Sequence, residues 1–253
     1  MSEIVRVAFC VARSDCESAV ARLLDLTPRG FEEIDRGDVV ELAAYVDARG
    51  ADAIRSAFPA SVTTGVEAGW EDRWREFHRP AWAGGVWLGP PWETPPPGAQ
   101  AVVIDPGRAF GTGAHPTTRL CVELLAELGR RGSLLDVGCG SGVLSIAAAR
   151  LGYGPIVAVD DDPTAVEVTR ANAAANGVEL EAWLADAESG TLPATDVAVA
   201  NILLRPIEAI LTRLDSGVAI TSGYLAGQRP LAGGWKTRTH LERDGWSADL
   251  LTR

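Results

Sequence analysis

Short apolar runs alternate with amphipathic segments from residue 133 to the end of the chain. The runs are rich in Val, Ile, Leu and Ala, which is typical of buried strands, and they lie at 134–137, 156–159, 180–184, 197–202 and 218–222. Helical spacing of apolar residues predicts helices at 116–128, 141–151, 163–176 and 206–214, with a short one near Gln228. This alternation predicts a parallel sheet with helices on both faces.

The last two apolar runs, 237–241 and 246–251, have no long helix between them. Two strands joined by a short connection pair as an antiparallel hairpin. The second half of the chain is therefore predicted to be a doubly wound α/β domain, residues 99–253, whose sheet ends in an antiparallel edge.

The first 68 residues carry shorter elements of a different order. Strands are predicted at 4–11, 31–34, 39–46 and 61–66, and helices from Ser14 or Asp15 to Gly30 and over 51–58. The order β-α-β-β-α-β is that of a ferredoxin-like α+β domain.

Residues 69–98 are rich in Trp, Pro and Gly, and we expect no continuous helix or sheet there. A plain linker is one interpretation. Five tryptophans are costly to leave in water, so we favour an interdomain connector that packs against both domains; they stand at positions 70, 74, 82, 87 and 92.

Composition narrows the class of partner. The chain has 253 residues and a formal net charge of −11, with Lys236 as its single lysine, so direct nucleic-acid binding is not expected and a basic protein partner fits better. No stretch approaches the roughly 20 apolar residues of a membrane span, and the N-terminus lacks an apolar signal core, so we expect a cytoplasmic protein without membrane contact. The four cysteines show no C-x-x-C spacing and predict no metal site.

The strongest local motif is DVGCGSG at 136–142, where the first strand of the sheet turns into a helix. Glycines at this turn let the backbone approach a nucleotide-like ligand beyond the strand ends. The spacing G-x-G-x-G differs from the G-x-G-x-x-G of dinucleotide binders, which weighs against a pyrophosphate ligand. A glycine turn needed only by the fold is the alternative.

Acidic and amide residues end the neighbouring strands. Asp160 ends the second strand, where a carboxylate accepts hydrogen bonds from ribose hydroxyls. Asp186 follows the third strand and is predicted either to contact an adenine amino group or to be a solvated turn residue. Asn201 ends the fourth strand and is predicted to accept a hydrogen bond from a substrate amine, or to cap the next helix. His115 ends a Gly- and Pro-rich loop and is either catalytic or a packed or capping residue.

These motifs resemble the ribosomal protein L11 methyltransferase family, also called PrmA. The resemblance rests on the stretches 105–118, 136–142, 159–163 and 201–203, and on the spaced tryptophans of 70–92. It implies a Rossmann-like class I methyltransferase fold, S-adenosylmethionine as cofactor and S-adenosylhomocysteine as product. It places Thr118, Gly138, Asp160 and Asn201 on cofactor-contact positions, and it assigns residues 1–68 to gripping a protein substrate.

Motifs and resemblance together predict one catalytic residue, Asn201, and a set of cofactor-binding residues, namely Phe110, Gly111, Thr112, Thr118, Asp136, Gly138, Gly140, Asp160, Asp186 and Asn201. The expected activity is methylation of lysine and/or N-terminal amines of a basic large-subunit ribosomal protein by a monomer. The alternatives are methyl transfer to another protein, a small amine or nucleic acid, a nicotinamide-dependent oxidoreductase, and a non-catalytic binding protein.

Overall fold

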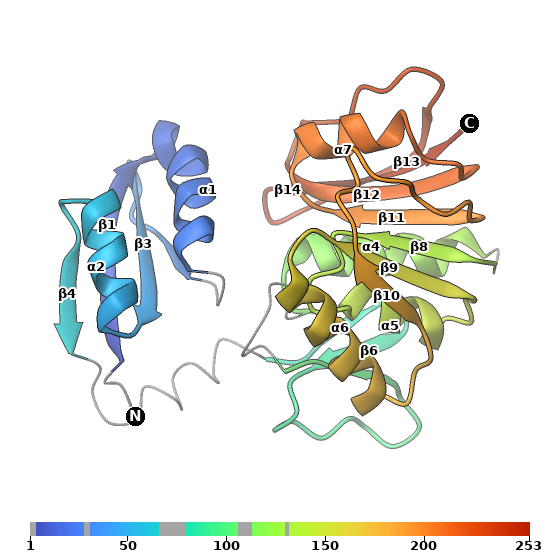
Figure 1. Ribbon diagram of the computed structural model, residues 1–253, viewed down its shortest axis with the longest axis horizontal. Helices are drawn as coiled ribbons and strands as arrows, with labels where there is room; N and C mark the ends of the chain where they lie inside the picture. Colours follow the sequence, from blue (N-terminus) through green and yellow to red (C-terminus); the bar gives the residue numbers. More distant parts are fainter. Residues whose placement is uncertain (1–3, 28–30, 66–78, 106–112, 130–131) are drawn as a thin grey trace. The chain divides into compact units, whose positions relative to one another are not determined.

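The protein is described by a computed structural model that covers residues 4–27, 31–65, 79–105, 113–129 and 132–253. The chain divides into two compact units, residues 1–77 and 78–253 (Figure 1). Within the described ranges, no helix is long and apolar enough to cross a membrane.

The first unit is an antiparallel sheet with two helices. After β1 (Val5–Ala12) and a 3-10 turn come α1 (Cys16–Leu26), β2 (Glu32–Asp35), β3 (Val39–Val46), α2 (Ala48–Ala57) and β4 (Val62–Gly65). The strand order is β2-β3-β1-β4, with every neighbouring pair antiparallel. Leu23 of α1 and Ile54 of α2 are fully buried in one cluster with Val7 and Leu42 of the sheet. The element order β-α-β-β-α-β is therefore present as predicted.

Part of the Trp- and Pro-rich segment forms strands, so the expectation of no sheet over residues 69–98 is wrong for residues 81–89. The strands β5 (Ala81–Ala83) and β6 (Val86–Gly89) make a hairpin, and β7 (Gln100–Val103) adds to β6 in parallel. The two-residue turn is Gly84-Gly85, with φ of 54° and 81°. Two residues with positive φ are what a tight hairpin turn requires, and glycine supplies both. Trp70 and Trp74 lie outside the described residues.

The described tryptophans of this segment do not share one environment. Trp87 is 3% exposed, and its neighbours Val86 and Leu88 belong to the core of the second unit, whereas Trp82 is 52% exposed. Buried and exposed side chains do not alternate along β6, because both faces of this strand are covered.

The second unit is built on a seven-stranded sheet. Its strands are β8 (Leu134–Val137), β9 (Ile156–Asp160), β10 (Glu181–Leu184), β11 (Val197–Asn201), β12 (Val218–Leu225), β13 (Lys236–Arg243) and β14 (Trp246–Thr252). The order is β10-β9-β8-β11-β12-β14-β13, in which β14 runs antiparallel to β12 and β13, and the other neighbours are parallel. The predicted doubly wound sheet with an antiparallel edge is confirmed.

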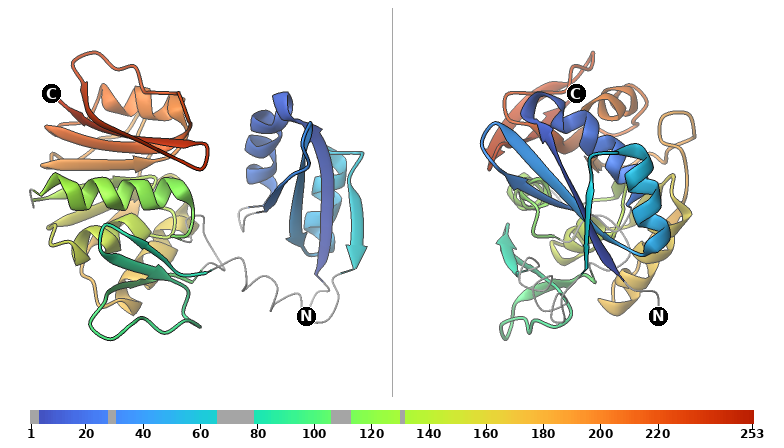
Figure 2. Two further views of the ribbon diagram at one scale, coloured as in Figure 1. Left: turned by 180° about the vertical axis from the view of Figure 1, so that it is seen from behind. Right: turned by 90° about the vertical axis from the view of Figure 1, so that its left-hand side faces the viewer.

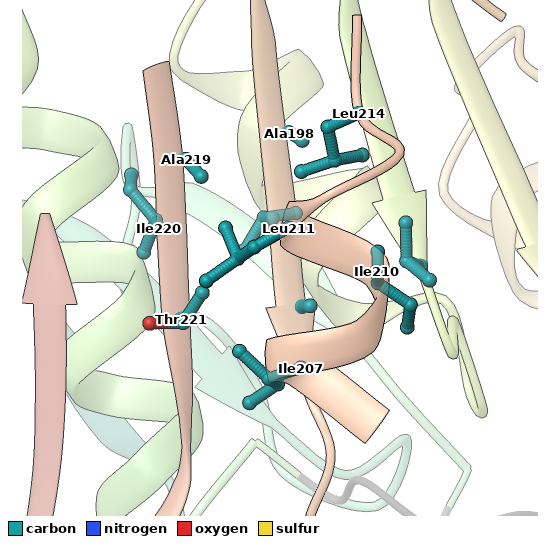
Figure 3. A pocket seen from close by; sticks show the side chains of 11 residues that line it. Ala198, Ile207, Ile210, Leu211, Leu214, Ala219, Ile220 and Thr221 are labelled. Atoms are coloured by element: carbon teal, nitrogen blue, oxygen red, sulfur yellow. The ribbon is translucent and has the colours of Figure 1, made fainter. Parts of the chain in front are cut away.

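Helices cover both faces of this sheet. They are α4 (Pro116–Leu128), α5 (Val143–Arg150), α6 (Pro163–Ala175) and α7 (Leu204–Leu211). The side chains of α4 and α5 pack in one apolar cluster with the sheet, and those of α7 pack in another. The ribbon of α4 lies on one side of the sheet and that of α7 on the other (Figure 2). Ile207, Ile210 and Leu211 of α7 line a small cavity over Ala198 and Ala219 of the sheet (Figure 3).

Among the helices of the second unit, the largest differences from the prediction concern α7 and a short helix that is absent. The helix predicted at 206–214 is α7, which begins at Leu204 and ends at Leu211. The short helix near Gln228 is absent; instead, the Gln228 side chain accepts a hydrogen bond from the Leu225 amide at 2.9 Å. Gly227 has a φ of 82°, and Gly234 has a φ of 87°. This left-handed backbone, together with Pro230, ends any helix before it completes a turn.

Candidate functional site

The predicted site residues meet at the carboxyl edge of the parallel strands. The chain order of the strands reverses between β8 and β11, and ligands of doubly wound folds bind in the crevice at such a reversal. Gly138 follows β8, Asp160 ends β9 and Asn201 ends β11, so three segments far apart in sequence reach the same edge.

The glycine turn after β8 has a conformation that other residues adopt rarely. Gly138, Gly140 and Gly142 have φ of 72°, 53° and 78°. A Cβ atom on Gly138 would lie 2.4 Å from Cγ2 of Ile202, the residue after Asn201. The fold itself therefore needs glycine at 138, and the role of this turn in binding a ligand stays a prediction.

Asp160 holds the glycine turn from the neighbouring strand. Its Oδ2 accepts a hydrogen bond from the Gly140 amide at 2.9 Å, and its Oδ1 accepts one from the Asp162 amide at 3.0 Å. Burial raises the pKa of Asp160, while these two backbone donors lower it. Each carboxylate oxygen keeps a second lone pair for a ligand. Asp162 caps α6 through the Thr164 amide at 2.8 Å.

Asp136 is the most deeply buried acid of the site, with 1% of its surface exposed. Its Oδ2 accepts hydrogen bonds from the Ser145 hydroxyl at 2.6 Å and the Ser145 amide at 3.0 Å. Its Oδ1 is buried and has no hydrogen-bond partner among the described residues. Burial raises the pKa of Asp136 to about 6, against the lowering effect of Ser145. Sequence reasoning missed Ser145, because a serine inside a helix carries no signal of its partner.

Asn201 and Thr118 come together although 83 positions separate them. The Asn201 Nδ2 donates to the Thr118 Oγ1 at 3.4 Å. Thr118 lies in the first turn of α4 and is 1% exposed. The alternative that Asn201 caps α7 is wrong, because the capping position is Leu203.

His115 is a helix cap in the structure. It holds the capping position of α4, where its Nδ1 accepts from the Thr117 amide at 3.4 Å, and its ring meets Trp246 edge-on at 4.9 Å between centroids. Burial lowers the pKa of His115 to about 4, so the imidazole is neutral near pH 7. Phe110, Gly111 and Thr112, from the loop before it, lie outside the described residues.

Asp186 bonds within its own turn. The carboxylate accepts from the Glu188 amide at 2.9 Å and from the Ser189 hydroxyl at 2.5 Å. The Ser189 bond is the main cause of the lowered pKa of Asp186. These contacts describe a solvated turn residue, and they leave the proposed adenine contact as a prediction.

The described residues hold no metal-binding cluster and no disulfide. Across the part of the chain that the structure describes, no group of three or more His, Cys, Asp or Glu side chains is arranged to hold a metal ion. All four cysteines are free thiols; Cys10 is exposed, and Cys121 and Cys139 are buried.

Comparison with known proteins decides the family. The model of the family described as "Ribosomal protein L11 methyltransferase (PrmA)" matches residues 33–252. The chain therefore belongs to the ribosomal protein L11 methyltransferase family. The match includes the glycine turn, Asp160 and Asn201, and it confirms the resemblance seen in the sequence motifs.

Individual relatives of this family match parts of the chain. A ribosomal protein L11 methyltransferase of Dechloromonas aromatica is 52% identical over 127 residues, which cover 49% of this chain and 42% of the relative. Another, from Yersinia pseudotuberculosis, is 45% identical over 161 residues, covering 62% of this chain and 54% of the relative. The chain thus spans about half the length of these curated relatives.

A solved structure of the same family gives a third comparison. The crystal structure of a ribosomal protein L11 methylase from Lactobacillus delbrueckii subsp. bulgaricus superposes with a TM-score of 0.60 at 27% identity, covering 67% of this chain and 95% of that one. The shared fold is that of the L11 methyltransferase family.

The raised pKa of Asp136 predicts how stability depends on pH. The folded chain binds this proton more tightly than the unfolded chain, whose Asp pKa is near 3.8, so stability is lost as the pH rises from about 4 through about 6. Asp136→Asn keeps an oxygen for Ser145 and removes the titration. Between pH 5 and pH 7, wild type should lose roughly 1 kcal/mol of unfolding free energy that the variant retains.

Urea denaturation at both pH values measures this difference. Asp162→Asn is the matched control, because asparagine caps a helix as well as aspartate does. Parallel pH dependences of wild type and Asp136→Asn would show that the buried carboxyl is not the titrating group.

Proposed function

We propose that this chain is an S-adenosylmethionine-dependent protein methyltransferase that methylates lysine and/or N-terminal amines of ribosomal protein L11. One observation carries the proposal: Asn201 lies within hydrogen-bond distance of Thr118 at the edge where the glycine turn and Asp160 also meet. Membership of a family described by that activity, and relatives that bear its name, support the substrate.

The residues at the edge fit the proposed cofactor. Gly138 and Gly140 have positive φ and no side chain, so a ligand can come close to their backbone, and Asp160 would supply carboxylate oxygens for the ribose hydroxyls. The partnerless Oδ1 of Asp136 matches the donor that an amino-acid ammonium group provides. When bound, S-adenosylmethionine supplies an activated methyl group on sulfur. Thr118, Phe110, Gly111, Thr112 and Asp186 complete the proposed set of contacts.

The protein's task is then to position a neutral amine. A lysine with a pKa near 10.4 must lose a proton, which costs roughly 4.6 kcal/mol at pH 7, whereas an α-amine near pKa 8 costs about 1.4 kcal/mol. A carboxylate beside the acceptor would stabilise the ammonium form and raise this cost. Asn201 and Thr118 are uncharged, and the low pKa of His115 keeps it neutral, so these groups leave the amine free to deprotonate. The Asn201 carbonyl can accept the remaining N–H and aim the nitrogen at the methyl group.

The division of labour along the chain is part of the proposal. We assign substrate recognition to a ferredoxin-like domain of residues 1–68, a connecting role to 69–98 and methyl transfer to 99–253, acting as a cytoplasmic monomer. The described residues of the first unit carry no motif typical of a catalytic or cofactor-binding site, which favours a role in substrate recognition.

A chain beginning at Gly69 should still bind S-adenosylhomocysteine but lose methylation of the ribosomal protein, because tethering raises the local concentration of the acceptor. Full methylation by that shorter chain would exclude the recognition role.

Transfer of a labelled methyl group from S-adenosylmethionine to purified ribosomal protein L11 tests the activity. Wild type should transfer, and Asn201→Ala should lower turnover by about a hundredfold or more while the dissociation constant of S-adenosylhomocysteine changes far less, since the side chain acts on the acceptor. Equal losses of turnover and affinity would make Asn201 a cofactor residue only.

The same assay separates the rival functions. If the label enters another protein, a small amine or RNA and not ribosomal protein L11, the chain is still a methyltransferase, but its substrate differs from the proposed one. No transfer to any acceptor by a chain that binds S-adenosylhomocysteine would indicate a binding protein.

A further inference from the structure

A buried polar cluster lies at the edge of the large sheet, outside the residues assigned to the cofactor. Thr221 and Tyr224 of β12 and Asp249 of β14 are 1%, 2% and 0% exposed. The Tyr224 hydroxyl is 2.8 Å from Asp249 Oδ2 and 2.9 Å from Thr221 Oγ1. The other oxygen of Asp249 is 2.9 Å from His240 Nδ1 on β13. The cluster thus ties together the last three strands of the sheet.

Hydrogen-bond accounting fixes the direction of these bonds. A phenol has one hydrogen, and two acceptors lie within its reach: Asp249 Oδ2 at 2.8 Å and the Thr221 backbone carbonyl at 3.0 Å. We assign the hydrogen to Asp249, the nearer of the two. Thr221 Oγ1 then donates to the phenol oxygen. Burial raises the pKa of Tyr224, so the phenol stays protonated and remains a donor. Removal of the hydroxyl would break both bonds and the contact with the Thr221 carbonyl.

These two bonds span an irregularity in β12. The pairing of β12 with β14 shifts register between Ser222 and Tyr224, which leaves Gly223 as a bulge with a φ of 103°. The Thr221 bond joins the residues on either side of the bulge, and the Asp249 bond joins the bulge to β14. The shape of the bulge therefore depends on the Tyr224 hydroxyl.

The bulge is in contact with the segment that carries Asn201. Asn201 stands opposite Ser222 in the parallel pairing, and the Ile202 amide donates to the Ser222 carbonyl at 3.1 Å. A Cβ atom on Gly223 would lie 2.1 Å from the Ile202 carbonyl oxygen, so the two backbones are already in contact. A change in the bulge would therefore reach Ile202 first, and Ile202 is the residue next to Asn201.

We propose that Tyr224, held by Asp249 and Thr221, is a positioning residue for Asn201. The proposal rests on the proposed function, since it concerns the amine-orienting role of that asparagine. The hydroxyl fixes the bulge, the bulge fixes Ile202, and Asn201 is thereby kept at the Thr118 hydroxyl.

A purely structural role is the competing explanation. Buried charged groups often stabilise a fold no better than well-packed apolar residues of the same size do. A role in stability alone would change the melting temperature and leave the orientation of Asn201 untouched. The test therefore needs measurements that do not depend on the stability of the fold.

Tyr224→Phe keeps the ring and removes the hydroxyl. The full-length variant should transfer methyl groups about tenfold or more slowly than wild type, while its dissociation constant for S-adenosylhomocysteine stays within about twofold, because small displacements of a positioning group act on turnover. In an Asn201→Ala background, Tyr224→Phe should cause no further loss of turnover, because it acts through the side chain already removed.

Tyr153→Phe is the matched control. Tyr153 is 5% exposed, and its hydroxyl donates to the Leu125 carbonyl at 2.7 Å, but it precedes β9, which is separated from β12 by β8 and β11. The Tyr153→Phe variant loses a buried phenol hydrogen bond in the same unit. It should keep wild-type turnover, even if its melting temperature falls.

A readout without catalysis separates this proposal from the proposed function. The side-chain amide NMR signals of Asn201, identified by their loss in Asn201→Ala, should shift in Tyr224→Phe and stay in place in Tyr153→Phe. Unshifted signals, or an independent loss of turnover in the Asn201→Ala background, would overturn the positioning role. If wild type transfers no methyl group, the proposed function fails, and the NMR comparison still decides whether Tyr224 positions Asn201.

Discussion

The site depends on a steric constraint at one residue, Ile202, which is held between two glycines. On one side a Cβ atom at Gly138 would meet its Cγ2, and on the other a Cβ atom at Gly223 would meet its carbonyl oxygen. Both glycines have positive φ, so a side chain at either position would be strained as well as crowded. The turn after β8, the end of β11 and the bulge of β12 are thereby locked at one edge of the sheet, which places the side chain of Asn201.

The second feature of the site is the way in which its buried carboxylates are stabilised. Two carboxylates lie at the same edge, and neither has a cationic side chain as its hydrogen-bond partner among the described residues. Asp160 is held by backbone amides, and Asp136 is held by the amide and hydroxyl of Ser145, so donors of the fold stabilise charge that burial disfavours. An edge built in this way keeps acceptor oxygens ready for a ligand that brings hydroxyl and ammonium donors.

Much of this arrangement could be predicted from the sequence, because it follows from local patterns. Alternating apolar runs predicted the parallel sheet, and Asp160 and Asn201 were placed by the rule that chemistry lies at strand ends. The hairpin at Gly84-Gly85 was overlooked because prolines dominate its surroundings, although two adjacent glycines between apolar residues are a turn signal. The Tyr224–Asp249 bond was beyond prediction, since it needs the antiparallel register of β12 with β14 and a bulge that no local pattern marks.

The central claim is that this edge binds a methyl-donor cofactor through Asp160. Calorimetric titration of the full-length chain with S-adenosylhomocysteine, in wild type and in Asp160→Ala, tests it most directly, with NADH as the contrasting ligand. We expect wild type to bind S-adenosylhomocysteine, Asp160→Ala to bind it about tenfold or more weakly through the loss of hydrogen bonds to a charged group, and NADH not to compete. Equal affinity in the two proteins, or displacement of S-adenosylhomocysteine by NADH, would contradict this account.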